Sequence, residues 1–267
     1  MSERAWHRAR LFLRAVLPLV AVAPGRRGGL ARGLAPATGA VRFAGPDPSL
    51  QALLRFEGGQ SRVLPPEAAP QAPADLTFRF RDLGQMNDFF AGKPAVPAVH
   101  PWLGLRSPRL LAATVQALLS LRVLEPKPAE VLARESPEER ALRVRLLLYL
   151  VTASLAQLHQ DGFPELLALS RGSPDRVYQW TVEGTDIATF VRMREGRFRA
   201  GRGVYGHRKP FVHFVFRDLD AAHAVLTAQG SQMTGFRGGL IATHGSPEYA
   251  RKVGLLMQRI DELLMEG

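Results

Sequence analysis

The chain contains Phe78-Arg79-Phe80-Arg81-Asp82-Leu83 and repeats this pattern 136 residues later as Phe214-Val215-Phe216-Arg217-Asp218-Leu219. A second pair of motifs follows in the same order, because Ser107-Pro108 returns as Ser246-Pro247 at an offset of 139. The alternating phenylalanines predict a core-facing strand, and the Asp after them is well placed to cap a helix. The repeat is far longer than the roughly 20–50 residues of solenoid repeats. The sequence therefore predicts one folded unit used twice.

Composition places the chain among globular proteins and excludes several kinds of site. Of the 267 residues, 46% are hydrophobic, which is ample for a core. The absence of cysteine excludes disulfides, zinc–thiolate sites and cysteine nucleophiles, and is compatible with a reducing compartment. The seven histidines form no metal-ligand spacing, and the chain has no Gly-x-Ser-x-Gly elbow and no Walker loop. We therefore expect no enzymatic activity, no catalytic residue, no metal and no cofactor.

The net charge of +11 is concentrated in two segments. Residues 1–40 and residues 192–209 each contribute +6, so the remaining 209 residues sum to −1. Local basic patches indicate an anionic partner, either lipid headgroups or nucleic acid. A solubilising surface is the alternative for either segment.

Residues 4–17 form two arcs on a helical wheel, one basic and one apolar with Trp6 and Phe12. The arginines of the basic arc are Arg4, Arg8, Arg10 and Arg14. Three interpretations follow: a helix lying on a bilayer, a helix packed on its own domain, or a signal peptide ending in Ala21-Val22-Ala23. Residues 1–39 are expected to be this helix and a linker.

The first unit is expected over residues 40–124. Gly58-Gly59 between two alternating segments predicts a hairpin, and the Pro-rich residues 94–101 predict a loop. Residues 125–170 are expected to be a helical connector, with a strong helix start at Ser136-Pro137-Glu138-Glu139. The apolar stretch of this helix is short and contains polar residues, which indicates a buried core helix rather than a membrane span.

The second unit is expected over residues 171–267, and its most informative local feature is a hairpin around Glu195-Gly196. If these two residues form the turn, the cross-strand pairs are Arg194–Arg197, Arg192–Arg199 and Met193–Phe198. One face is then apolar, and the other carries four arginines. Like charges directly opposite one another are destabilising, so the basic face indicates anion binding or compensating acids. A solvated face with flexible side chains is the alternative.

The second unit then continues in an order that resembles a known domain. The hairpin is followed by the strand and helix start at Phe211–Ala222, by Gly239-Leu240-Ile241-Ala242-Thr243-His244-Gly245-Ser246, and by a closing amphipathic helix. This order, over about 176–265, resembles the sterol carrier protein type 2 fold, a lipid-binding α+β domain. A weaker copy covers about 40–124. The chain departs from the family in having the domain twice and in having a Pro-rich loop at 94–101 where a strand is expected.

The resemblance implies an α+β fold in which a mainly antiparallel sheet is covered by helices. It also implies a hydrophobic tunnel between the sheet and the helices, able to take a fatty acyl chain, a sterol or a phospholipid. The expected lining residues are Phe78, Phe80, Met86, Phe89, Phe90 and Leu111 in the first unit and Phe214, Phe216, Leu226, Met233, Phe236, Leu256 and Ile260 in the second. Apolar residues at this spacing are also what an ordinary core requires.

Two functional hypotheses follow. In the first, the chain is a non-catalytic lipid-binding protein of the cytoplasm that holds an apolar ligand and docks on anionic membrane, with nucleic acid the less favoured partner. Docking would use the four N-terminal arginines together with Arg192, Arg194, Arg197 and Arg199. In the second, the chain is an interaction or scaffold protein with filled cavities, whose basic faces bind a protein partner or nucleic acid.

Overall fold

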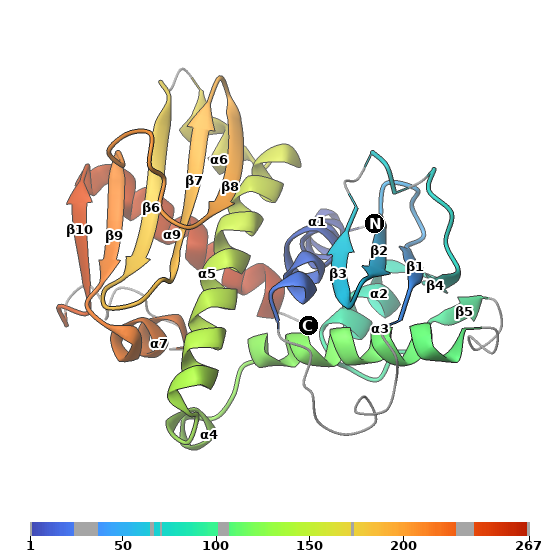
Figure 1. Ribbon diagram of the computed structural model, residues 1–267. Coiled ribbons are helices and arrows are strands. Elements are labelled where there is room, and N and C mark those ends of the chain that lie inside the picture. The colour runs from blue at the N-terminus through green and yellow to red at the C-terminus, as the bar shows by residue number, and fades with distance from the viewer. Residues whose placement is uncertain are drawn as a thin grey trace. The chain divides into compact units, whose positions relative to one another are not determined.

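The computed structural model describes residues 2–23, 37–64, 67–69, 71–100, 107–171, 174–227 and 238–265. The chain divides into two compact units, residues 1–125 and 126–266. Each unit combines one five-stranded sheet with helices, so the fold is α+β (Figure 1). The prediction of two sheet-and-helix units is therefore confirmed.

The first sheet has the strand order β3-β2-β1-β4-β5. Its strands are β1 (Gly39–Ala44), β2 (Gln51–Glu57), β3 (Gln60–Val63), β4 (Leu76–Arg79) and β5 (Ala98–His100). The helices of this unit are α1 (Glu3–Leu11), the π-helix η1 (Phe12–Val16), the 3-10 helix η2 (Leu17–Ala21), α2 (Leu83–Phe90), α3 (Pro108–Ser120) and the 3-10 helix η5 (Leu121–Leu124). β1 and β4 pair in parallel, and every other pair of neighbours is antiparallel.

The second sheet has the order β10-β9-β6-β7-β8, which matches the first when β6 to β10 replace β1 to β5. Its strands are β6 (Arg176–Val182), β7 (Ala188–Arg194), β8 (Arg197–Arg202), β9 (Val212–Phe216) and β10 (Ile241–Gly245). Its helices are α4 (Ala129–Ala133), α5 (Pro137–Gln160), α6 (Pro164–Ser170), α7 (Leu219–Thr227) and α9 (Pro247–Met265). β6 and β9 form the parallel pair, as β1 and β4 do in the first sheet.

The repeated motif has the same local structure in both units. Its phenylalanines are buried, on β4 or just after it in the first unit and on β9 in the second. Asp82 and Asp218 each accept a hydrogen bond from a backbone N–H three residues later, at 2.8 and 2.6 Å. The arginine before each Asp donates to its other carboxylate oxygen, at 2.8 and 3.0 Å. The predicted helix caps are therefore confirmed, and the Arg–Asp pair is an addition that the sequence analysis did not make.

Three expectations about the chain's organisation need correction. Residues 94–101 are not all loop, because Ala98–His100 pair with β4 as the edge strand β5. Residues 1–23 belong to the first unit rather than to a separate leader, since their apolar side chains are buried in it. Residues 126–170 belong to the second unit rather than to a connector, since α5 packs against β7 and β8.

The helix α5 begins as predicted, with Ser136 and Glu139 forming a reciprocal capping box. Among the described helices, α5 is the one long and apolar enough to cross a membrane, but 61% of its most apolar window is buried in the protein. The hydroxyl of Thr152 on α5 lies 2.9 Å from the hydroxyl of Thr189 on β7. The His159 ring of α5 packs edge-on against Phe198 of β8. These contacts agree with the prediction of a buried core helix.

The N-terminal segment supplies core of the first unit, and this gives a testable result. Leu13 is 0% exposed, whereas Leu119 on α3 is 51% exposed. We expect Leu13→Ala to lower the free energy of unfolding by about 2–5 kcal/mol, and Leu119→Ala to lower it by less than about 1 kcal/mol. Hydrogen exchange of peptides from β2 and β3, measured by mass spectrometry, reports the change. Equal effects of both substitutions would contradict the packing of this segment on its own unit.

Candidate functional site

In the first unit, most of the expected ligand-lining side chains pack on one another. Six phenylalanines form one cluster in which neighbouring ring centroids lie 5.2–6.2 Å apart. The cluster consists of Phe12, Phe43, Phe78, Phe80, Phe89 and Phe90. Met86 is fully buried and Leu111 is half-buried on α3. These residues therefore have the arrangement of an aromatic core.

In the second unit, the expected residues are divided between core and a groove. Phe214 and Phe216 lie on the helix-covered face of the sheet, where Phe214 stacks on Trp180 with centroids 5.1 Å apart. Ile260 is buried on α9, and Leu226 is half-buried on α7. Met233 and Phe236 lie outside the described residues. Leu256 is the one expected residue that lines the groove.

This groove lies between α6 and α9 and has a volume of about 480 Å³. Its lining residues are Glu165, Ala168, Leu169, Arg171, Tyr249, Lys252, Leu255, Leu256 and Arg259. The apolar side chains of the lining include Leu169, Leu255 and Leu256, and Leu255 is 59% exposed. Ligand sites typically have volumes of about 300–1,000 Å³ and mostly apolar walls with a few polar groups. The α6–α9 groove has both properties.

The polar side chains of the groove carry an excess of positive charge, with three basic groups and one carboxylate. Lys252 is paired with Glu248 at 2.6 Å and Arg259 with Glu262 at 2.8 Å, both on the solvent-exposed side of α9. Arg171 has no ion pair among the described residues. Because exposed ion pairs contribute about 0–1 kcal/mol, an arriving anion can displace them. The rim can therefore bind a carboxylate or a phosphate.

One wall of the groove contacts a half-buried cluster of Arg176, Phe211 and Tyr249. The guanidinium of Arg176 lies over both rings, 4.3 Å from the Phe211 centroid and 4.4 Å from the Tyr249 centroid. Burial opposes the charge of Arg176, but its contacts with the hydroxyls of Tyr249 and Tyr178 together outweigh burial, so the pKa of Arg176 is raised. Burial raises the pKa of the neighbouring Tyr178 to about 12. Arg176 therefore fixes the Tyr249 ring at the start of α9.

The arginine hairpin has the predicted register. Arg192 faces Arg199, Met193 faces Phe198 and Arg194 faces Arg197. The turn residues Glu195 and Gly196 have φ values of 52° and 69°, as a tight two-residue hairpin turn requires. The apolar pair is buried and three of the four arginines are exposed.

The compensating acid that the like-charge pairs predict is Asp175. It accepts two hydrogen bonds from Arg192, at 2.8 and 2.5 Å, and its carboxylate lies 3.3 Å from Arg208. The hydrogen bonds from Arg192 hold the pKa of Asp175 below its usual value. Arg192 is therefore neutralised, while Arg194, Arg197 and Arg199 remain at the surface.

The four N-terminal arginines do not form the exposed basic face that the helical wheel indicates. Arg8 is 8% exposed beside the Phe12 ring, and its burial lowers the pKa of the guanidinium. Arg10 lies over the Trp6 ring at 4.5 Å, and Arg14 donates to the Ser49 carbonyl at 3.3 Å. Of the four, Arg4 alone is exposed. Packing of the helix on its own unit, one of the three interpretations, is what the structure has.

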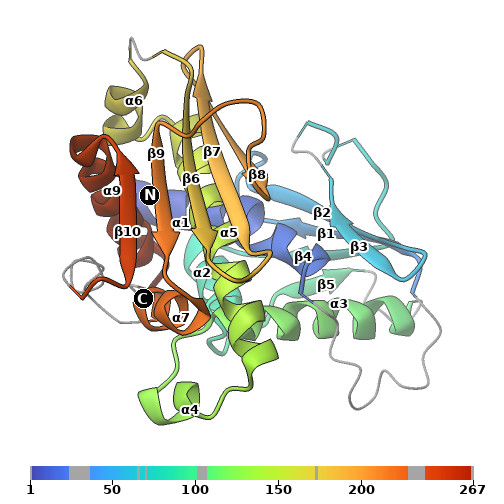
Figure 2. The same ribbon diagram turned by 60° about the vertical axis from the view of Figure 1, so that its left-hand side comes forward.

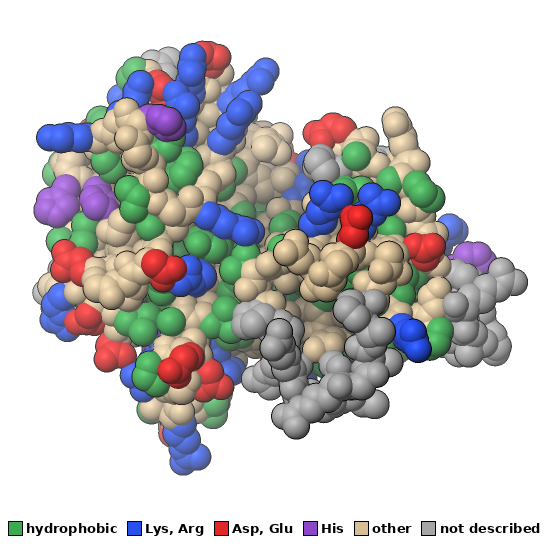
Figure 3. All heavy atoms as spheres, in the orientation of Figure 1, with side chains coloured by type: hydrophobic (Ala, Val, Ile, Leu, Met, Phe, Trp, Pro, Cys, Tyr) green, Lys and Arg blue, Asp and Glu red, His purple; other side chains and the backbone are tan. Residues whose placement is uncertain are grey.

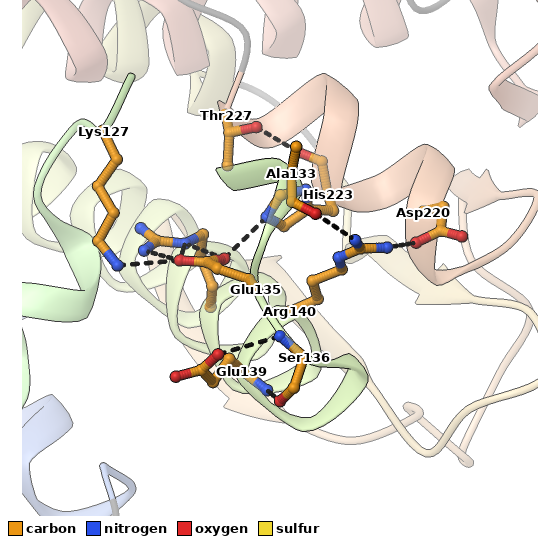
Figure 4. A network of polar contacts seen from close by, with 10 residues as sticks. Lys127, Ala133, Glu135, Ser136, Glu139, Arg140, Asp220, His223 and Thr227 are labelled. Carbon is orange, nitrogen blue, oxygen red and sulfur yellow. Dashed lines mark hydrogen bonds and ion pairs between the residues drawn. The ribbon is translucent and has the colours of Figure 1, made fainter. Parts of the chain in front are cut away.

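A buried ionic network that the sequence analysis did not find centres on Glu135 (Figure 4). Arg143, 2% exposed, donates to both oxygens of Glu135, and Lys127 donates to one of them at 2.9 Å. The His223 ring contacts the other oxygen at 3.1 Å. Burial opposes ionisation of Glu135, but the hydrogen bonds from Arg143, Lys127 and His223 outweigh it and lower its pKa to about 2.

The geometry of this network favours a structural role. Its members come from the segment before α5, from α5 and from α7, and His223 of α7 is 88 residues from Glu135 in the sequence. Both oxygens of the carboxylate are occupied and the group is 8% exposed. Breaking a buried ion pair leaves an uncompensated charge and typically costs about 3–5 kcal/mol. The network therefore joins three elements of the second unit.

The depressed pKa of Glu135 predicts a pH dependence of stability. A lowered folded-state pKa contributes stability above the unfolded-state pKa, about 4.3, and this contribution is lost as pH falls towards 2. We expect Glu135→Gln to lower the free energy of unfolding by about 3–5 kcal/mol at neutral pH and to flatten its fall below pH 4.3. Urea unfolding followed by circular dichroism from pH 2 to 7 measures both effects. The control is Glu130→Gln, an exposed carboxyl on α4, which should keep the wild-type profile.

Sequence reasoning missed most of the groove. Arg171, Lys252 and Arg259 fall outside the strand and helix patterns that predict core, and α6 was included in the expected connector. One signal was present, because Leu255 lies beside Leu256 but off the buried stripe of α9. A single exposed leucine is common on protein surfaces, so this signal gains meaning only beside the apolar lining of the groove.

Among the described residues, no three His, Asp or Glu side chains lie close enough together to hold a metal ion. In comparisons with known proteins, no family model matches the chain and no curated protein matches it.

Proposed function

We propose that the second unit binds an amphipathic lipid with an anionic headgroup. The acyl part lies in the α6–α9 groove, and the headgroup contacts the basic rim. The observation that carries this proposal is the combination of a groove of about 480 Å³, an exposed leucine inside it and three basic side chains around it.

The apolar part of the proposal follows from Leu255. Leaving a leucine side chain 59% exposed forgoes part of the roughly 1.5–3 kcal/mol that full burial would contribute. An acyl chain in the groove would cover Leu255 together with Leu256, Leu169 and Ala168. Hydrophobic contact of this kind is non-directional, so it supports binding of a chain without fixing its length.

The headgroup part follows from Arg171. Its planar guanidinium can donate two parallel hydrogen bonds to a carboxylate or a phosphate. Lys252 and Arg259 add positive charge on the facing helix, and together with Arg171 they outnumber the one carboxylate of the lining, Glu165, so the rim favours an anionic headgroup. A fatty acid or an acidic phospholipid therefore fits the groove better than an uncharged sterol.

The proposed lipid site does not extend to the first unit. Its expected lining side chains form the phenylalanine cluster, and Phe12 of the N-terminal segment is stacked on Phe90. This packing favours the second hypothesis, a filled interior, for that unit alone. We assign the ligand to the second unit.

The test is native mass spectrometry of the full chain after delipidation and exposure to oleate, phosphatidylglycerol and cholesterol. We expect one bound oleate or phosphatidylglycerol and no bound cholesterol. Failure to retain any of the three, with hydrogen exchange showing a folded second unit, would overturn the proposal.

Replacement of the exposed leucine tests the groove. Leu255→Glu places a carboxylate against the acyl chain, so we expect oleate affinity to fall at least about tenfold, equivalent to about 1.4 kcal/mol. The matched control is Leu167→Glu, since Leu167 is also an exposed leucine of the groove's two helices but does not line it. Equal affinity of the two variants would place the ligand elsewhere.

Charge reversal at the rim tests the headgroup. A hydrogen bond to a charged group contributes about 1.5–3 kcal/mol, so Arg171→Glu should weaken oleate binding about tenfold or more. The neutral methyl ester of oleate should be much less affected. Arg134→Glu, an exposed arginine of the same unit away from the groove, is the control. Equal losses for the acid and the ester would contradict a headgroup contact at Arg171.

A further inference from the structure

We propose that one end of the second sheet is a docking surface for an anionic phospholipid bilayer. The surface consists of Arg194, Arg197 and Arg199 of the β7–β8 hairpin, and we name it the arginine end. The docking itself does not require the groove. Docking would allow a lipid to pass from the bilayer to the groove, and this transfer step rests on the proposed function.

The sheet topology places the hairpin and the groove at the same end. The β7–β8 turn lies where β7 ends and β8 starts. Because β6 pairs with β7 in antiparallel, β6 starts at this same end of the sheet. Arg171, at the end of α6, is five residues before the start of β6. Figure 2 shows α6 beside this end of β6 and β9. The Tyr249 wall of the groove is there too, because it contacts Arg176, the first residue of β6.

The charge of this end is not balanced by its acids. Asp175 is occupied by Arg192 and Arg208, and Glu195 pairs with Arg194 at 2.8 Å in an exposed contact. Within the described residues, Arg197 and Arg199 have no ion pair. Figure 3 shows Lys and Arg side chains gathered over the β7–β8 turn, with few acidic side chains among them. A surface of this kind favours an anionic partner.

The first unit provides an internal comparison. Its β2–β3 hairpin also has a two-residue turn, Gly58-Gly59, and a cross-strand arginine pair, Arg55–Arg62. The pair beside that turn is Glu57–Gln60, where the second unit has Arg194–Arg197. The pair beside the turn therefore has two arginines in the second unit where the first unit has none, while each hairpin tip has one glutamate, Glu57 or Glu195. The fold does not require this charge.

A bilayer suits the arginine end better than nucleic acid does. Tyr249, which lines the apolar groove, lies at the same end, and a bilayer surface offers both phosphate groups and acyl chains. The aromatic side chains nearby are not arranged as stacking platforms for bases, since Tyr205 packs edge-on against Phe190 and also contacts Arg192. We therefore assign lipid headgroups to the arginine end.

Vesicle sedimentation tests the docking. The full chain should bind vesicles of phosphatidylcholine with a third phosphatidylserine and should not bind pure phosphatidylcholine. Each arginine near an anionic surface contributes about a fivefold change in partitioning, so the triple variant R194E/R197E/R199E should bind at least about 100-fold more weakly. Binding should also be lost at 1 M salt, where the Debye length is about 3 Å.

The matched control is R55E/R62E/R79E, which reverses three exposed strand arginines of the first sheet and changes the net charge equally. If this control loses vesicle binding as fully as the triple variant does, a local docking surface is wrong. A higher affinity of the wild-type chain for a single-stranded or double-stranded oligonucleotide than for the anionic vesicles would also overturn the assignment.

Docking and lipid binding can fail separately. The triple variant should still bind oleate from solution in native mass spectrometry, and Leu255→Glu should still sediment with anionic vesicles. Loss of vesicle binding by Leu255→Glu, with Leu167→Glu unaffected, would show that the groove rather than the arginine end holds the bilayer. Unchanged vesicle binding by the triple variant would overturn the docking proposal and leave the proposed function standing.

Discussion

The parallel pairing of β6 with β9 requires the chain to cross the second sheet between β8 and β9, and the charge arrangement depends on this crossing. Residues 203–211 run over the open face, where the fully buried Gln179 side chain binds them. Its amide donates to the Gly203 carbonyl at 3.3 Å, and its oxygen accepts from the Tyr205 N–H at 2.9 Å. The crossing brings Arg208 to Asp175, so one carboxylate serves both Arg208 and Arg192. Among the described residues, Arg194, Arg197 and Arg199 of the hairpin form no ion pair with Asp175.

In the first unit the chain also crosses the sheet before its parallel strand, β4, but different contacts hold the crossing segment. There the segment between β3 and β4 includes Ala69, Ala72 and Ala74, which pack on Ala40 and Leu53 of the first sheet. The Ala72 carbonyl accepts a hydrogen bond from Arg42, and Asp75 accepts one from the Ala40 N–H at 2.8 Å. Apolar burial does in the first unit what the amide of Gln179 does in the second. A crossing segment of small apolar residues brings no positive charge to the end of its sheet.

Local features of the structure could be predicted from the sequence, and features that join distant segments could not. The caps at Asp82 and Asp218 and the register around Glu195-Gly196 depend on residues within a few positions of one another. The groove needs α6 and α9, and the Glu135 network joins His223 to a residue 88 positions earlier. A helical wheel predicts a surface position for Arg8, because it places residues around one helix and does not show what packs against that helix.

The two units show how one backbone topology can carry two physical roles. In the first, the N-terminal segment adds Phe12 to a cluster that fills the space under the sheet, so side chains complete the fold. In the second, the Glu135 network joins the start of α5 to α7, and none of its residues lines the α6–α9 groove. The buried polar contacts of this unit are therefore separate from the surface proposed to bind lipid, so a substitution at Glu135 changes the stability of the unit and leaves the lining of the groove intact.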